Sequence, residues 1–99
     1  MGDFIRIDSQ EVMHESGYHV FSAGREYIGY KDKNKNYRVL RELGWDPKTK
    51  SGYESIYSSD IFDENMKKVI LSKMEKDEII SRIVTAEQFM TNFTIEVVE

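Results

Sequence analysis

The 99-residue chain carries a net charge of −4, with 39% apolar residues, 32% charged residues and no cysteine. This length predicts one domain over residues 1–99, and the composition is that of a folded, water-soluble protein rather than a disordered one. The lack of cysteine excludes disulfides, thiol catalysis and cysteine-ligated zinc, and no apolar run reaches membrane-spanning length.

The first third of the chain predicts short strands. Residues 3–8 (DFIRID) alternate between apolar and polar side chains, which is typical of a strand. Residues 9–16 (SQEVMHES) predict a single helical turn. Residues 18–22 and 25–30 predict a β-hairpin, because Gly24 between them can supply the positive φ that such a turn needs.

The middle of the chain is ambiguous. Residues 36–43 predict a short helix, because Gly44 follows where a helix ends and Pro47 stands just beyond. The apolar residues of this segment also alternate, so a strand is the alternative. Residues 53–58 (YESIYS) predict a strand.

Residues 61–75 predict the main helix. Asp63 and Glu64 stand four residues before Lys67 and Lys68, a spacing that forms ion pairs along a helix and suits its dipole. A strand–turn–strand arrangement through residues 63–66 is the alternative. The apolar side chains recur at helical spacing and are expected to pack in the core: Phe62, Met66, Val69, Ile70 and Met74.

The last third completes the fold prediction. Residues 78–85 (EIISRIVT) are rich in β-branched side chains and predict a strand, although their spacing also suits a helix. Residues 86–91 predict a short helix, and 93–99 a final strand. The expected fold class is therefore α+β: a small, mostly antiparallel sheet packed on one main helix at about 61–75, with short helices at about 36–43 and 86–91.

The two histidines nearly match the zinc-protease pattern H-E-x-x-H. They are His14 and His19, five residues apart instead of four. Five residues do not place both rings on one helix face, and in a strand they lie on opposite faces. We therefore expect no metal and no cofactor. A small metal-dependent hydrolase built from these histidines and an acid such as Glu15 is our third functional hypothesis.

Known catalytic signatures are absent from the sequence. It holds no P-loop, no G-x-G-x-x-G and no G-x-S-x-G. We therefore expect that the protein is not an enzyme and that no residue is catalytic.

Aromatic and basic residues gather between residues 27 and 57. Tyrosine, tryptophan and arginine dominate binding hot spots, and aromatic rings mixed with bases also suit single-stranded nucleic acid. Packing of most of these rings in the core is the alternative. The candidate binding residues are Tyr30, Lys33, Lys35, Tyr37, Arg38, Trp45, Tyr53 and Tyr57.

The charge is unevenly distributed. Residues 1–50 hold nine bases and eight acids, a net +1, whereas residues 51–99 hold five bases and ten acids, a net −5. An acidic half suits a basic partner. Phe, Tyr, Met, Ile, Asn and Lys greatly outnumber Gly, Ala, Arg and Pro, which indicates an AT-rich gene of the kind common in low-GC bacteria and their phages.

These observations favour a binding role. We expect a small cytoplasmic protein-binding module of the phage or mobile-element type, which inhibits a larger host enzyme such as a defence nuclease. The alternative is an accessory protein that binds single-stranded nucleic acid or a nucleotide. No membrane partner is expected, and the sequence predicts no oligomeric state.

Overall fold

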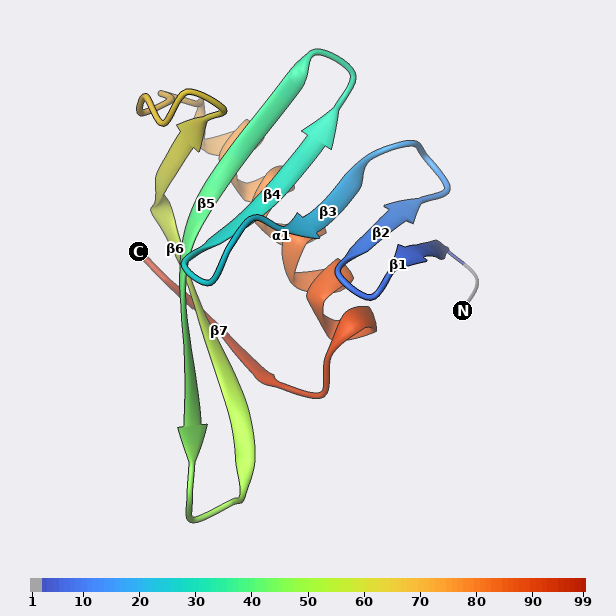
Figure 1. Cartoon of the computed structure of the whole chain (residues 1–99). Helices are drawn as coiled ribbons and strands as arrows, with labels where there is room; N and C mark the ends of the chain where they lie inside the picture. The colour runs from blue at the N-terminus through green and yellow to red at the C-terminus, as the bar shows by residue number, and fades with distance from the viewer. Residues whose placement is uncertain (1–2) are drawn as a thin grey trace.

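Strands dominate the computed structural model, which describes residues 3–99. One sheet of seven strands has the spatial order of the chain, β1-β2-β3-β4-β5-β6-β7. Neighbours are antiparallel from β1 to β6, but β7 is parallel to β6 because helix α1 carries the chain back between them (Figure 1). The bounds are β1 Phe4–Asp8, β2 Glu11–His14, β3 His19–Ser22, β4 Tyr27–Asp32, β5 Lys35–Asp46, β6 Ser51–Asp63, α1 Lys73–Met90 and β7 Thr94–Val98.

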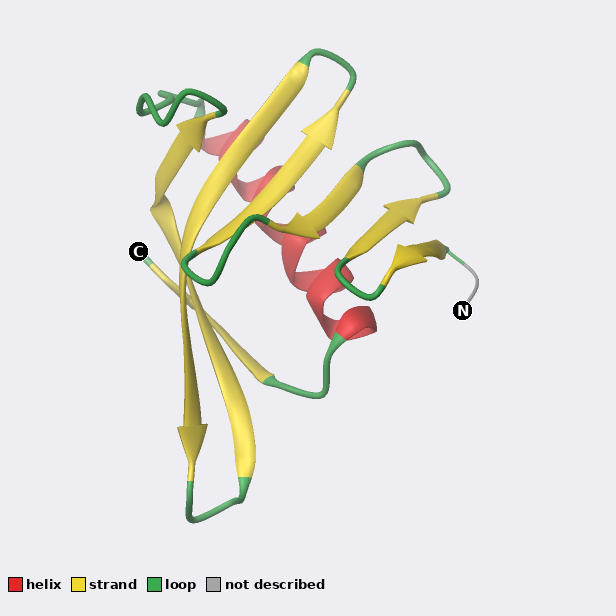
Figure 2. Cartoon of the chain, in the orientation of Figure 1, coloured by secondary structure: helices red, strands yellow, loops and turns green. Residues whose placement is uncertain are grey.

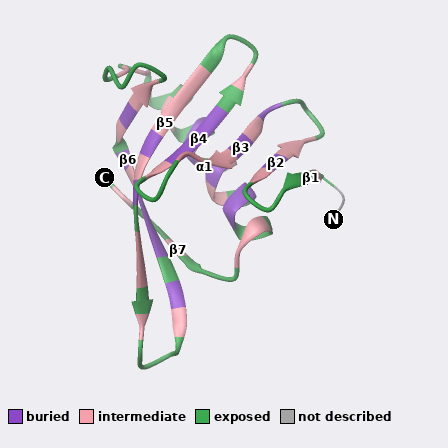
Figure 3. Cartoon of the chain, in the orientation of Figure 1, coloured by how far each residue is buried: buried purple, intermediate pink, exposed green. Residues whose placement is uncertain are grey.

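The core lies between one face of the sheet and α1. The helix crosses behind the strands in Figure 2, and among residues 3–99 no second helix covers the front. Buried segments in Figure 3 fall on the strands and on the helix face that meet there. The buried apolar side chains of this layer are Val12, Tyr18, Val20, Ile28, Tyr30, Val39, Ile56, Ile61, Ile79, Ile80, Ile83 and Ala86.

This architecture overturns the expected fold class. The sheet is mixed and the helix spans Lys73–Met90, so a main helix at 61–75 with extra short helices was wrong. Residues 36–43 lie within β5, and 86–91 end the long helix. Residues 78–85 are helical rather than extended, and 9–16 contain β2 rather than a helical turn.

A turn at Asp63 prevents the expected helix at 61–75. The Asp63 carboxylate accepts the backbone N–H groups of Asn65 at 2.8 Å and Lys67 at 2.9 Å. Met66 has a φ of 64°, which is incompatible with a right-handed helix. The expected apolar stripe consequently never forms, and two of its members, Ile70 and Met74, are 94% and 82% exposed. Aspartate favours such turns because its short side chain can bond the backbone just ahead of it.

The helix begins at a capping box. Ser72 Oγ accepts the backbone N–H of Glu75 at 3.2 Å, which satisfies a donor that the first helical turn leaves free. From there, buried side chains recur at helical spacing and give α1 its core-facing stripe: Ile79, Ile80, Ile83, Ala86 and Glu87. The same isoleucines had favoured a strand by their β-branching, but the helical alternative was correct.

Several local predictions are confirmed. Strands β3 and β4 form the expected hairpin, and Gly24 in its turn has a φ of 95°. Strands were also expected where β1, β7 and part of β6 occur.

No helix within residues 3–99 is long and apolar enough to cross a membrane.

Candidate interaction surface

The β5–β6 hairpin projects from the rest of the sheet. These strands have 12 and 13 residues, roughly twice the length of their neighbours, and a register shift between Val39 and Arg41 separates the two halves of the hairpin. The half with the 47–50 turn extends beyond α1 and β1–β4 (Figure 1). We call residues 42–57 the arm. It carries two exposed large aromatic side chains, Trp45 and Tyr53.

Strand register places the two arm aromatics on opposite faces. Trp45 is paired with Gly52, and Tyr53 is paired with Gly44. Since neighbouring residues of a strand alternate in direction, Trp45 lies on the face that α1 covers further along, and Tyr53 lies on the uncovered face. Trp45 is 63% exposed and Tyr53 is 39% exposed.

Glycine is required under Tyr53. A Cβ at Gly44 would overlap the Tyr53 ring. This contact explains Gly44, which therefore serves the hairpin and not the end of a helix, while Pro47 stands in the turn. On the opposite face the Phe93 ring lies over Gly52, so Trp45 and Phe93 share that side of the arm.

The uncovered side of the arm combines tyrosines with acids. Strands β5, β6 and β7 contribute Glu42, Asp46, Tyr53, Tyr57 and Glu96, which we call the tyrosine–carboxylate face. The Tyr57 hydroxyl donates to Glu42 Oε1 at 3.2 Å. Desolvation raises the pKa of Tyr57 above 10.0, and the negative charges of Glu42 and Glu96 raise it further.

A groove runs along this face. Its volume is about 530 Å³, and the residues that line it include Tyr53, two carboxylates and several hydroxyls, but no lysine or arginine. The lining residues are Asp46, Thr49, Ser51, Gly52, Tyr53, Thr94 and Glu96. A groove of this composition has a negative potential and suits a cationic side chain.

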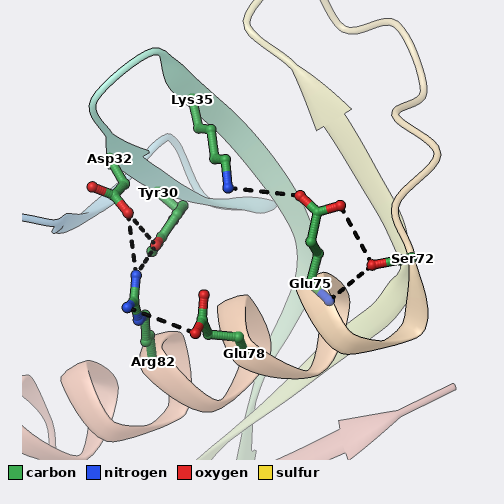
Figure 4. Close-up of polar contacts among 7 residues, drawn as sticks. All are labelled: Tyr30, Asp32, Lys35, Ser72, Glu75, Glu78 and Arg82. Atoms are coloured by element: carbon green, nitrogen blue, oxygen red, sulfur yellow. Dashed lines mark hydrogen bonds and ion pairs between the residues drawn. The ribbon is translucent and has the colours of Figure 1, made fainter.

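Three of the sequence-predicted binding residues act within the fold instead. Tyr30 is 1% exposed in the core, and its hydroxyl accepts a hydrogen bond from Arg82 Nη1 at 2.7 Å (Figure 4). Lys35 lies 3.6 Å from the Glu75 carboxylate on the helix. Tyr37 is half-buried and packs against the same core. These three side chains tie β4 and β5 to α1.

The predicted basic binding residues lie apart from the arm, whose own lysines, Lys48 and Lys50, are exposed in its turn. Arg38 and Lys31 sit over the Phe21 ring, with 5.1 Å and 5.5 Å to its centroid. Arg38 also donates to Asn36 Oδ1 at 2.6 Å, and Lys33 is exposed in the β4–β5 turn. Arg38 and Lys31 are therefore both engaged with the Phe21 ring. The structure does not bring the predicted basic and aromatic residues into a single surface.

The two histidines also lie apart. His14 stacks on Tyr18 with 4.7 Å between ring centroids, next to the core. His19 lies on the uncovered face, where its Nδ1 is 2.7 Å from Glu11 Oε2. Within the described part of the chain, no group of three or more His, Asp or Glu side chains is arranged to hold a metal ion.

A buried charged cluster anchors the base of the arm. Arg41 Nη1 donates to Glu54 Oε2 at 3.0 Å, and its Nη2 donates to Ser22 Oγ and to the Gly24 carbonyl, both at 2.8 Å. Glu87 of α1 lies near Glu54, and burial followed by this acidic neighbour raises the pKa of Glu87 to about 8. The adjoining cavity is only about 100 Å³, so we interpret the cluster as structural.

The sequence analysis did not identify the carboxylates of this surface, which are Glu42, Asp46 and Glu96. The alternation of acids with apolar residues in their strands was the pattern that could have indicated an exposed acidic face. Phe93 was also not identified from the sequence.

The chain matches no protein-family model, no curated protein and no solved structure. Its function is therefore argued from this geometry.

Proposed function

We propose that the chain is a small protein-binding module, and that its arm binds a basic surface on a larger protein. The observation that carries this proposal is Trp45, which is 63% exposed near the end of a projecting hairpin. Tryptophan and tyrosine are the residue types that most often dominate binding energy at interfaces. The proposal assigns the protein no catalytic step.

The arm carries aromatic anchors on both sides. Trp45 and Phe93 lie on one face, and Tyr53 lies on the other. A cleft in the partner that receives the arm could therefore contact large rings from two directions. Removing such rings from water upon binding is favourable at about 25 cal/mol per Å² of apolar surface.

The acids of the tyrosine–carboxylate face determine the charge of the partner. Glu42, Asp46 and Glu96 attract lysine and arginine, which accelerates encounter and disfavours acidic competitors. Enzymes that act on nucleic acids carry basic grooves of this kind. Occupation of such a groove by the arm would inhibit the enzyme, and the cytoplasm is where we place this interaction.

Nucleic-acid binding has weaker support. It requires exposed rings next to free cations. Tyr30 is in the core, Lys35 faces Glu75, and the Phe21 ring is already covered by Arg38 and Lys31. Tyr53 lies in a groove with the carboxylates of Asp46 and Glu96, which repel phosphate, and the only lysines of the arm are Lys48 and Lys50 in its turn.

Affinity capture with matched variants tests the proposal. The immobilised protein is incubated with nuclease-treated lysate of its native cell at low and high salt. The arm variant combines Trp45→Ser with Glu96→Lys. The control combines Ile70→Ser with Glu15→Lys, which makes the same chemical changes at exposed positions outside the arm.

We expect the wild type and the control to retain the same protein, and the arm variant to lose it. Retention should also fall as salt rises, because carboxylate–cation attraction is screened. Equal retention by the arm variant would contradict the proposal, as would retention of nucleic acid alone when nuclease is omitted.

A further inference from the structure

Strand β7 ends the sheet with an open edge. It is the last strand in the order, and only β6 pairs with it among the described strands. Its sequence TIEVV contains neither proline nor lysine, the residues that commonly block edge strands, and the register with β6 is continuous over five pairs. The backbone groups along its free side are therefore available to another strand.

The two faces of β7 have different chemistry. Glu96 belongs to the tyrosine–carboxylate face, next to Ser55 of β6. Val97 points to the helix side, where it is 43% exposed. There it lines a groove of about 640 Å³ between α1 and β6–β7, which has apolar side chains from Leu71, Ile80 and Val84.

We propose that an extended segment of the partner pairs with the free edge of β7 as an eighth strand, with basic side chains on the tyrosine–carboxylate face and aliphatic side chains in the groove beside α1. The inference rests on the proposed function and identifies how the partner is recognised. Backbone hydrogen bonds supply affinity in this mode, and alternate side chains supply specificity.

The dimensions of β7 fit a short segment. A strand advances about 3.3 Å per residue, so five residues span roughly 17 Å. Along this length, a partner strand directs two or three side chains to each face. Lysine or arginine at alternate positions would meet Glu96 and its acidic neighbours, while valine or isoleucine in between would extend the apolar lining next to Val97.

The same charges disfavour a second copy of this chain. Antiparallel pairing of β7 with β7 of another copy would bring the Glu96 carboxylates of both chains to neighbouring strands on one face, since Glu96 is the central residue of the strand. Like charges opposite each other destabilise a sheet. The basic alternating strand is therefore the occupant that this edge favours.

A synthetic peptide tests the inference directly. The probe is an acetylated, amidated six-residue peptide of alternating lysine and valine. Binding is followed by NMR through chemical shifts and amide hydrogen exchange of the whole chain. We expect alternate backbone amides of β7 to exchange about tenfold more slowly with the peptide bound, since amides in sheet pairs are protected.

Two altered peptides separate strand pairing from charge attraction. One has the lysines and valines in two blocks, and the other keeps the alternation but has N-methyl groups on alternate amides. Each should bind about tenfold more weakly, a loss of about 1.4 kcal/mol. In the protein, Glu96→Lys and Val97→Glu should each weaken binding of the original peptide, whereas the control change Ile70→Ser should not.

Unprotected β7 amides in the peptide complex would overturn the inference, as would equal binding of the N-methylated peptide or no binding at all. None of these results affects the capture experiment, in which loss of the partner depends on Trp45 and Glu96. A failure of strand addition is thereby distinguished from a failure of the proposed function.

Discussion

The carboxyl groups of Glu87 in α1 and Glu54 in β6 are buried close to each other in the core, and burial and this neighbour together raise the pKa of Glu87 to about 8. Arg41 donates to Glu54 Oε2, whereas the buried Glu54 Oε1 accepts no hydrogen bond from the described residues, so a protonated Glu87 nearby is the group that can supply a donor. A proton on Glu87 therefore completes the cluster. This relationship fixes the helix to the base of the arm and makes the stability of the protein depend on pH.

The first prediction concerns that dependence. The pKa of Glu87 is about 8 in the folded protein, whereas a glutamate that is free of these contacts, as in the unfolded chain, has a pKa of 4.5. Between these values the folded state keeps a proton that the unfolded state has lost, so the free energy of unfolding should decrease as pH rises, by up to about 1.4 kcal/mol per pH unit. This contribution is fully present below pH 4.5. Urea denaturation at pH 5.5, 6.5 and 7.5 measures it.

Two variants assign the effect to Glu87. Glu87→Gln keeps the shape and cannot ionise, so its stability should lose most of the slope in this window. Glu78→Gln, on an exposed turn of the same helix, should keep the wild-type slope. An unchanged slope in Glu87→Gln would show that other groups cause the pH dependence.

The second prediction concerns Arg41. Arg41→Leu leaves the fully buried Glu54 carboxylate without its cation, which should cost about 3–5 kcal/mol of unfolding free energy. The double variant Arg41→Leu with Glu54→Leu removes both charges and should recover much of that loss. Denaturant unfolding measures both. If the double variant is as unstable as the single one, the unpaired charge is not the cause.

The third prediction concerns the start of the helix. Ser72→Ala removes the side chain that accepts the Glu75 N–H and should destabilise the protein by about 1 kcal/mol. Ser59→Ala, at an exposed strand position, is the matched control and should change stability much less. Thermal unfolding compares them. Equal effects would contradict a cap at Ser72.

The fourth prediction uses the single tryptophan. Because Trp45 is the only tryptophan, fluorescence excited at a wavelength that tyrosine does not absorb reports on the arm alone. We expect red-shifted emission and efficient acrylamide quenching in the free protein, since the indole is largely in water. The captured partner should shift the emission to shorter wavelength and reduce quenching. Blue-shifted emission in the free protein would place the indole in a buried environment.

Local signals in the sequence predicted local structure. The β3–β4 hairpin followed from Gly24, which acts within its own turn. The capping box at Ser72 and Glu75 is also a local signal, but it was not used. The longer apolar pattern that begins at Phe62 favoured a helix at 61–75 instead. Phe62 instead belongs to β6, where it pairs with Arg38 of β5. That partner is distant in sequence, and no pattern near residue 62 indicates it.

At the candidate surface too, residue types could be predicted locally, but their arrangement depends on pairing between distant residues. Residue type alone suggested Trp45 and Tyr53, but their opposite faces depend on pairing with Gly52 and Gly44. Glu96 reaches the surface only because the helix returns the chain parallel to β6. The number of aromatic residues could not show that Tyr30 is in the core, since tyrosine suits both a core and an interface.

Photo-crosslinking from the arm tests the central claim most directly. Benzoylphenylalanine replaces Trp45 in one protein and the exposed Ile70 in another, and both are irradiated in the native cell. We predict one specific protein adduct from position 45 that is absent from position 70 and is lost when Glu96→Lys is added. No adduct from position 45, or the same adducts from both positions, would contradict a binding role for the arm.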